Sequence, residues 1–252
     1  MLPEMFNSHA PTPTRTAGWR ILAIGDCNTS GTGRPSPENC VPSRLAGRLA
    51  DAGYPCSVQN LGYRMSTTRE GLVRTERDAE PADIVLINFG LVDAWITSIP
   101  KIYVPYYPDN LVRKQARKLL KWTKRRLRSP LARRFVPIGT VVPQEEYVRN
   151  LCEMVDIVGA WQPRPTVLFW GTALTVGNPE RSASIREYNV RMQALAEALG
   201  IPYIDTPALM EGLDPADAYQ DRTHLDAPAV ERVASAMADA VLMERRQERR
   251  AA

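Results

Sequence analysis

Short apolar runs that stop at glycine alternate along the chain with longer segments in which apolar residues recur every three or four positions. Residues 83–89 (DIVLINF) are almost continuously apolar and end at Gly90. A run of this length without polar alternation is typical of a strand that is covered on both faces, and therefore of a parallel sheet. Four further runs predict strands at residues 21–24, 56–61, 166–170 and 202–204.

The segments between these runs predict helices. They cover residues 35–52, 67–79, 143–161, 184–199 and 228–245. Strands that alternate with helices predict a doubly wound α/β fold, a three-layer α/β/α sandwich around a five-stranded parallel sheet of the flavodoxin-like type. We expect a single domain over residues 19–248, preceded by a flexible tail at residues 1–18.

A basic insert over residues 109–134 interrupts this alternation. Residues 111–134 contain eleven basic residues and no acidic one, although the whole chain has a net charge of only +4, so the rest of the protein is net negative. At 100° per residue, the apolar and basic residues of 111–131 fall on opposite halves of a helix. Three interpretations remain open: a surface helix packed on the body with a solvated charged face, a contact with anionic lipid, or a contact with an acidic saccharide or nucleotide-linked substrate.

Charge and composition exclude several classes of protein. Because the basic residues are confined to one segment, a protein that coats nucleic acid is not expected. No apolar run approaches the roughly 20 residues that span a bilayer, and the first eighteen residues lack the apolar core of a secretory signal. We expect a cytoplasmic protein, with a peripheral position at the inner membrane surface as the alternative. The scattered cysteines and two histidines predict no metal site, and no cofactor is expected.

Candidate chemistry lies where the predicted strands end. Cys27 follows the first strand, and such a thiol is either a small buried hydrophobe or a nucleophile presented at the sheet edge where ligands bind. His224 is the only histidine outside the tail, and Asp221 precedes it by three residues. A lone histidine is often structural, but this spacing lets a carboxylate hold one ring nitrogen while the other accepts a proton from a nucleophile.

Four short blocks of the chain resemble those of the SGNH, or GDSL-like, hydrolase superfamily. The blocks are Gly25-Asp26-Cys27, Asn60-Leu61-Gly62, Gly90-Leu91-Val92-Asp93 and Asp221-Arg222-Thr223-His224. They occur in the order of the family and run from about residue 20 to residue 225. The resemblance implies a catalytic triad of Cys27, His224 and Asp221, and an oxyanion hole at Cys27, Gly62 and position 92. It also places Asp26, Asn28, Asn60 and Asp93 in the crevice as candidate substrate-binding residues.

The chain departs from the family pattern at two positions. Cys27 stands where the family has its nucleophilic serine, and a nearby imidazole is expected to generate the thiolate easily because a thiol has an unperturbed pKa of about 8.5. Val92 stands where the family has an asparagine, so one side-chain donor of the oxyanion hole is absent. Asn28 or Asn60 is the candidate substitute donor.

Two hypotheses follow from these residues. The first is a Cys-dependent acyl hydrolase or acyltransferase that forms a thioester on Cys27 and acts on an acylated carbohydrate or a related small substrate. The second is an inactive SGNH-like module that binds a glycan or an acylated ligand. The retained Asp221 and His224 favour the enzyme, and Val92 favours the module. The resembling proteins with Gly-x-Val-Asp and a basic insert are associated with bacterial surface-polysaccharide biosynthesis.

Overall fold

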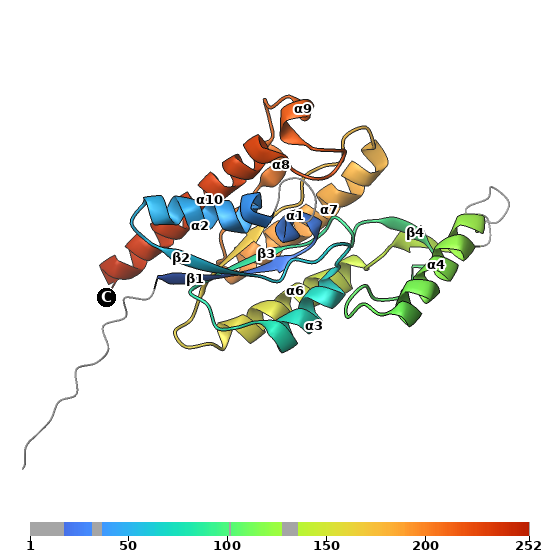
Figure 1. Ribbon diagram of the computed structural model, residues 1–252, viewed down its shortest axis with the longest axis horizontal. Coiled ribbons are helices and arrows are strands. Elements are labelled where there is room, and N and C mark those ends of the chain that lie inside the picture. The colour runs from blue at the N-terminus through green and yellow to red at the C-terminus, as the bar shows by residue number, and fades with distance from the viewer. Residues whose placement is uncertain (1–17, 32–36, 101, 128–135, 252) are drawn as a thin grey trace, which may run out of the picture.

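The computed structural model of the chain describes residues 18–31, 37–100, 102–127 and 136–251 (Figure 1). Its central sheet is parallel, with the spatial order β2-β1-β3-β6-β7. The strands are β1 (Trp19–Gly25), β2 (Cys56–Asn60), β3 (Ile84–Asn88), β6 (Thr166–Trp170) and β7 (Tyr203–Ile204). The predicted five-stranded parallel sheet is therefore confirmed.

Helices cover both faces of this sheet (Figure 1). One layer consists of α2 (Val41–Asp51) and α10 (Ala227–Ala251), and the other of α3 (Thr68–Asp78), α6 (Gln144–Gly159) and α7 (Pro179–Leu199). Ile21 of β1 packs into the α2–α10 core, whereas its neighbour Leu22 packs into the opposite core. Because successive side chains of a strand point to opposite faces, two covered faces require the continuous apolar runs seen in the sequence.

Four short elements complete the described α/β body. They are α1 (Cys27–Ser30), the 3₁₀ turn η1 (Pro37–Asn39), α8 (Thr206–Leu209) and α9 (Pro215–Ala218). The helix predicted from residue 35 begins only at Val41, after η1, and residues 35 and 36 lie outside the described part of the chain. Conversely, α7 begins five residues before the predicted start, because Asn178 caps it and Pro179 occupies its first position.

The insert is flanked by a small sheet that the sequence did not predict. Strands β4 (Ile96–Ser98) and β5 (Ile138–Thr140) pair in antiparallel fashion and flank α4 (Leu111–Arg126). Three-residue strands are too short to show an alternating pattern. Residues 1–17 of the predicted tail (1–18) and residues 128–134 of the insert lie outside the described residues.

One interpretation of the sequence packs the apolar half of α4 on the body and leaves its charged half in solvent. In the structure, α4 is rotated about its own axis relative to this arrangement. Arg117 is buried, whereas Leu111, Val112, Leu119 and Trp122 are 78%, 78%, 66% and 54% exposed. The guanidinium of Arg117 is held against the segment that precedes the helix by an ion pair with Asp109, a 2.7 Å hydrogen bond to the Pro105 carbonyl and stacking on Tyr106. None of the described helices combines the length and low charge that a bilayer span needs.

Candidate active site

Cys27 lies in a tight turn at the carboxyl end of β1. The Asp26 carboxylate caps α1 by accepting the Asn28 amide proton at 3.1 Å, and its other oxygen accepts that of Leu91 at 3.3 Å. Gly25 is required at the start of the turn, because a Cβ there would lie 2.6 Å from the Asn88 carbonyl oxygen. The turn therefore places the first residue of α1 over the ends of the neighbouring strands.

His224 is held by the carboxylate of Asp221. Its Nδ1 lies 2.7 Å from Asp221 Oδ2, and its backbone N–H donates to Asp221 Oδ1 at 2.9 Å. Thr223 N–H donates to the same oxygen at 2.6 Å. Partial burial acts to raise the pKa of Asp221, but the hydrogen bonds from the His224 ring and these amides outweigh it and keep the pKa well below its usual range. An ionised Asp221 fixes the proton of neutral His224 on Nδ1, which leaves Nε2 as the acceptor.

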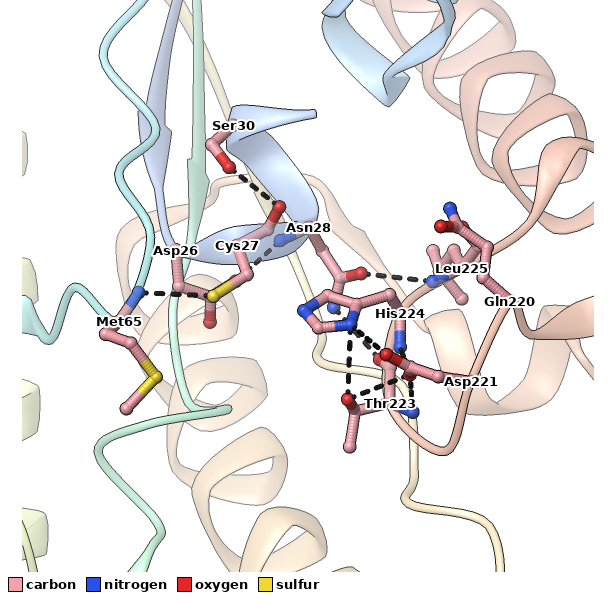
Figure 2. A network of polar contacts seen from close by, with 10 residues as sticks. All are labelled: Asp26, Cys27, Asn28, Ser30, Met65, Gln220, Asp221, Thr223, His224 and Leu225. Atoms are coloured by element: carbon pink, nitrogen blue, oxygen red, sulfur yellow. Dashed lines mark hydrogen bonds and ion pairs between the residues drawn. The ribbon is translucent and has the colours of Figure 1, made fainter. Parts of the chain in front are cut away.

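Asn28 connects the turn of Cys27 to the loop of His224. Its Oδ1 accepts the Leu225 amide proton at 3.2 Å, and its Nδ2 donates to the Thr223 carbonyl at 3.5 Å. In Figure 2, the edge of the His224 ring that faces away from Asp221 points toward the Cys27 side chain. Among the described residues no hydrogen bond joins Cys27 to His224, and such contacts commonly tighten only when substrate binds. The three residues of the predicted triad thus lie in one region, and Asn28 is a structural bridge.

The thiol of Cys27 is buried, and its surroundings favour the protonated form. It is 6% exposed, and its Sγ accepts the backbone N–H of Met65 at 3.2 Å. Burial and the nearby charge of Asp26 raise its pKa to about 11. The expectation of an easily formed thiolate is therefore wrong. His224 would have to remove the proton as the sulfur attacks, as a general base does for a hydroxyl nucleophile.

The GDSL-like Lipase/Acylhydrolase family matches residues 23–231, which include all four blocks. The chain belongs to this family. No curated protein matches the chain by sequence.

Solved structures share the fold at low sequence identity. A lipase/acylhydrolase from Enterococcus faecalis has a TM-score of 0.62 at 19% identity, over 88% of this chain and 95% of the other. A catalytic mutant of an acetylxylan esterase from Geobacillus stearothermophilus has a TM-score of 0.59 at 21% identity, over 88% and 93%. A carbohydrate acetylesterase from Sinorhizobium meliloti has a TM-score of 0.56 at 18% identity, over 89% and 99%.

In this member of the GDSL-like family, one amide predicted for the oxyanion hole has a partner within the fold. The N–H of Gly62 donates to Asn60 Oδ1 at 2.8 Å, so this amide is not directed at the thiol. Gly62 instead allows α1 to approach, because a Cβ there would lie 2.4 Å from Ser30 N. The amide that reaches Cys27 Sγ is that of Met65, which the sequence reasoning missed. Met65 has a φ of 63°, a left-handed conformation that is uncommon for a residue other than glycine.

Like Asn28, the other three candidate substrate-binding residues are hydrogen-bonded within the fold. Asp26 is fully buried and bonded as described above, and burial raises its pKa to about 6. Asp93 is also fully buried; its Oδ1 accepts from Thr68 N at 2.9 Å and from Thr68 Oγ1 at 2.7 Å, and burial raises its pKa to about 7. Asn60 donates to the Thr29 carbonyl at 2.8 Å, so its amide is not the substitute oxyanion donor. Each of these side chains is hydrogen-bonded to the backbone of a segment that is distant in sequence, and the sequence does not reveal such contacts.

Arg181 is a second residue that the sequence reasoning missed. It comes from the first turn of α7, stacks over the Trp95 ring at 4.7 Å and donates to the Leu91 carbonyl at 3.2 Å. Burial lowers the pKa of Arg181, and the nearby carboxylates of Asp26 and Asp221 oppose this effect. This places one cation beside the segment that carries Val92, which is itself 3% exposed and has no donor.

A cavity of about 350 Å³ opens beside Met65 and Val92. Its other walls come from the β4–β5 region and from α4, so the insert forms part of the site's surroundings (Figure 1). The described residues contain no group of three side chains that would suit a metal ion.

Proposed function

We propose that this acylhydrolase cleaves or transfers an acyl ester of a carbohydrate through a thioester on Cys27. The observation that carries the proposal is the imidazole of His224, fixed by Asp221 and facing the thiol. The acetylxylan esterase and the carbohydrate acetylesterase that share the fold support a carbohydrate ester as substrate. We extend the proposal to acylated surface polysaccharides of bacteria, built on the cytoplasmic side, on the resemblance noted in the sequence.

The reaction would proceed in two steps. Cys27 Sγ attacks the ester carbonyl while His224 Nε2 takes its proton, and the same proton then goes to the departing sugar oxygen. This forms the C–S bond and breaks the C–O bond. Water, or a hydroxyl of a second sugar, next attacks the thioester as His224 accepts its proton, and the thiol is restored. The N–H of Met65 is the donor closest to the sulfur and is our candidate for stabilising the oxyanion.

Mass spectrometry of the intact protein tests the covalent step directly. Incubation with an activated acetyl ester should add one acetyl group to wild type, and peptide mapping should place it on Cys27. Cys27→Ala should form no adduct. Asp221→Asn should fold normally and react up to about 10⁴-fold more slowly, because the imidazole loses its correct tautomer. An adduct on another residue, or equal rates in these variants, would move the site elsewhere.

The inactive-module hypothesis rests on Val92, and a substitution separates it from the enzyme. One missing oxyanion donor costs roughly 2.7–4 kcal/mol of transition-state stabilisation. Val92→Asn should therefore raise turnover of 4-nitrophenyl acetate, by up to about 10²-fold if the amide is correctly aimed. Cys27→Ser with Val92→Asn restores the family's residues and should give a serine esterase. If this double variant melts like wild type but both proteins are inert, the binding module is the better description.

We also propose that the outer side of α4 contacts an anionic membrane surface. Its exposed side chains Leu111, Val112, Leu119 and Trp122 form an apolar stripe, and Lys114 and Lys118 lie beside it. Each basic residue near such a surface contributes about 1 kcal/mol, and the stripe can enter the headgroup region. Cosedimentation with phosphatidylserine vesicles should weaken with salt and be lost in Leu119→Ser with Trp122→Ser. Equal binding by the variant would contradict the proposal.

A further inference from the structure

The cavity beside the site combines an apolar interior with a cationic wall. Its lining includes the aromatic rings of Trp95, Tyr103 and Tyr106 together with Val104 and Val141. Its α4 side contributes four basic side chains: Arg117, Lys121, Lys124 and Arg125. None of its lining residues is acidic, so negative charge is favoured in this space.

The basic side chains line the cavity because of the orientation of α4 about its own axis. If the apolar half of the helix packed on the body, as the sequence pattern suggests, these side chains would point to solvent. Arg117 is instead anchored by Asp109 and Tyr106, which turns the following basic residues toward the cavity. The ammonium of Lys121 lies 5.7 Å from the centre of the Tyr106 ring, one turn further along the helix. Two cations of α4 thus stack on the same aromatic ring.

The position of the cavity relates it to the thiol. Met65 lines the cavity and also reaches Cys27 with its backbone N–H, and Val92, another lining residue, stands at the oxyanion position of the family. A group joined to an ester at Cys27 can therefore extend past Met65 toward α4. The volume of about 350 Å³ is at the small end of ligand pockets and fits a single sugar ring with its substituents.

We propose that this cavity selects an anionic saccharide, one that carries a carboxylate or a phosphate on the ring next to the acylated hydroxyl. The assignment rests on the proposed function for the position of the ester, but the binding of the anion does not depend on turnover. A carboxylate and a phosphate share the same recognition by ammonium and guanidinium groups. The experiment therefore compares a sugar that carries a carboxylate with one that carries a phosphate.

The test is a binding measurement on Cys27→Ala, in which no acyl transfer through the thiol can occur. The probes are glucose, glucuronic acid and glucose 6-phosphate, titrated by calorimetry at low salt. One of the two anionic sugars should bind roughly tenfold or more tightly than glucose, the effect expected of two partly exposed charge pairs. The preference should shrink at physiological salt. The tighter of the two anions identifies the charged group.

Matched variants locate the effect on the inner side of α4. In the Cys27→Ala background, Lys121→Gln with Lys124→Gln should abolish the preference for the anionic sugar. Lys118→Gln with Arg126→Gln removes the same charge from α4 residues that do not line the cavity, and should retain the preference. Circular dichroism verifies that both variants keep the fold. Equal binding of all three sugars, including no binding by any, or an equal loss in both variants, overturns the proposal.

Failure of the proposed function would look different. Wild type would then form no acyl adduct on Cys27, while the preference for an anionic sugar and its loss with Lys121 and Lys124 would persist. The cavity would in that case serve a binding module for anionic saccharides. If the adduct forms but neutral and anionic sugars bind alike, the acyl chemistry stands and this cavity does not select the substrate.

Discussion

At the scale of single residues, the protonation state of Cys27 determines how the site can react. The thiol is buried next to Asp26, and both effects favour the neutral form. A cysteine in a GDSL-like acylhydrolase therefore does not work here as a stored thiolate. In the proposed reaction it resembles the serine of the family, because His224 would have to remove its proton during the attack.

The pH dependence of alkylation tests this protonation state. With a pKa of about 11, the thiolate fraction of Cys27 should rise roughly tenfold per pH unit between pH 7 and pH 10. The rate of reaction with iodoacetamide, followed by peptide mass, should rise in the same way. His224→Ala should show the same slope, since no imidazolium stabilises the thiolate. A rate that is already constant above pH 6 in wild type would show a thiolate–imidazolium pair instead.

At the scale of elements, the site depends on how closely α1 lies against the loop that follows β2. Gly62 permits this approach, because any Cβ at this position would lie within 2.8 Å of the Thr29–Ser30 backbone. The helix has only four residues and is held at its ends by Asp26 and by Gly31, whose φ of 62° is left-handed. A shift of α1 would move Cys27 relative to both His224 and the Met65 amide.

Gly62→Ala should therefore reduce both stability and activity. Overpacking of this kind typically costs about 1–3 kcal/mol of unfolding free energy, which urea denaturation can measure. Gly47→Ala is the matched control: Gly47 lies within α2, and an added Cβ would meet nothing within 4 Å. That variant should be more stable than wild type by roughly 0.5–1 kcal/mol, because alanine favours a helix. Equal stability of Gly62→Ala and wild type would contradict the packing argument.

At the scale of the whole molecule, buried carboxyls under the site make stability depend on pH. Asp93 is fully buried, and its pKa rises from 3.8 to about 7 in the folded protein. Between these values the folded state binds more protons than the unfolded state, so the unfolding free energy falls as pH rises. The contribution of Asp93 is complete below about pH 4 and is lost as pH rises through 7.

Asp93→Asn isolates this effect. Asparagine keeps an oxygen for Thr68 and stays neutral, while its NH₂ group takes the place of Oδ2, which has no partner among the described residues. Relative to wild type, the variant should gain about 2.6 kcal/mol of stability from pH 5 to pH 8. Denaturation curves at pH 5 and pH 8 measure the gain. Asp26 is present in both proteins, so its own titration cancels in the comparison. Parallel pH dependence in the two proteins would exclude Asp93 as the source.

The sequence by itself determined the sheet and the proximity of Asp221 and His224. Strands covered on both faces must be continuously apolar, so residues 84–88 could be assigned without the structure. Asp221 and His224 are three residues apart, so a single local turn brings their side chains into contact. The glycine that ends β1 is likewise a local requirement of the turn that carries Cys27, because an added Cβ would lie 2.1 Å from Oγ1 of Thr29, four residues along the chain.

Only the tertiary structure decided which partner each remaining polar group meets. Asp93 bonds to Thr68 and Asn60 to Gly62 and Thr29, so residues that resembled ligand contacts are bonded within the fold. The amide of Met65 faces the thiol because of its backbone conformation, which its residue type does not signal. The orientation of α4 about its own axis depends on the contacts of Arg117 with Asp109 and Tyr106. An amphipathic pattern shows that a helix has two faces, but the buried one is set by packing against other segments.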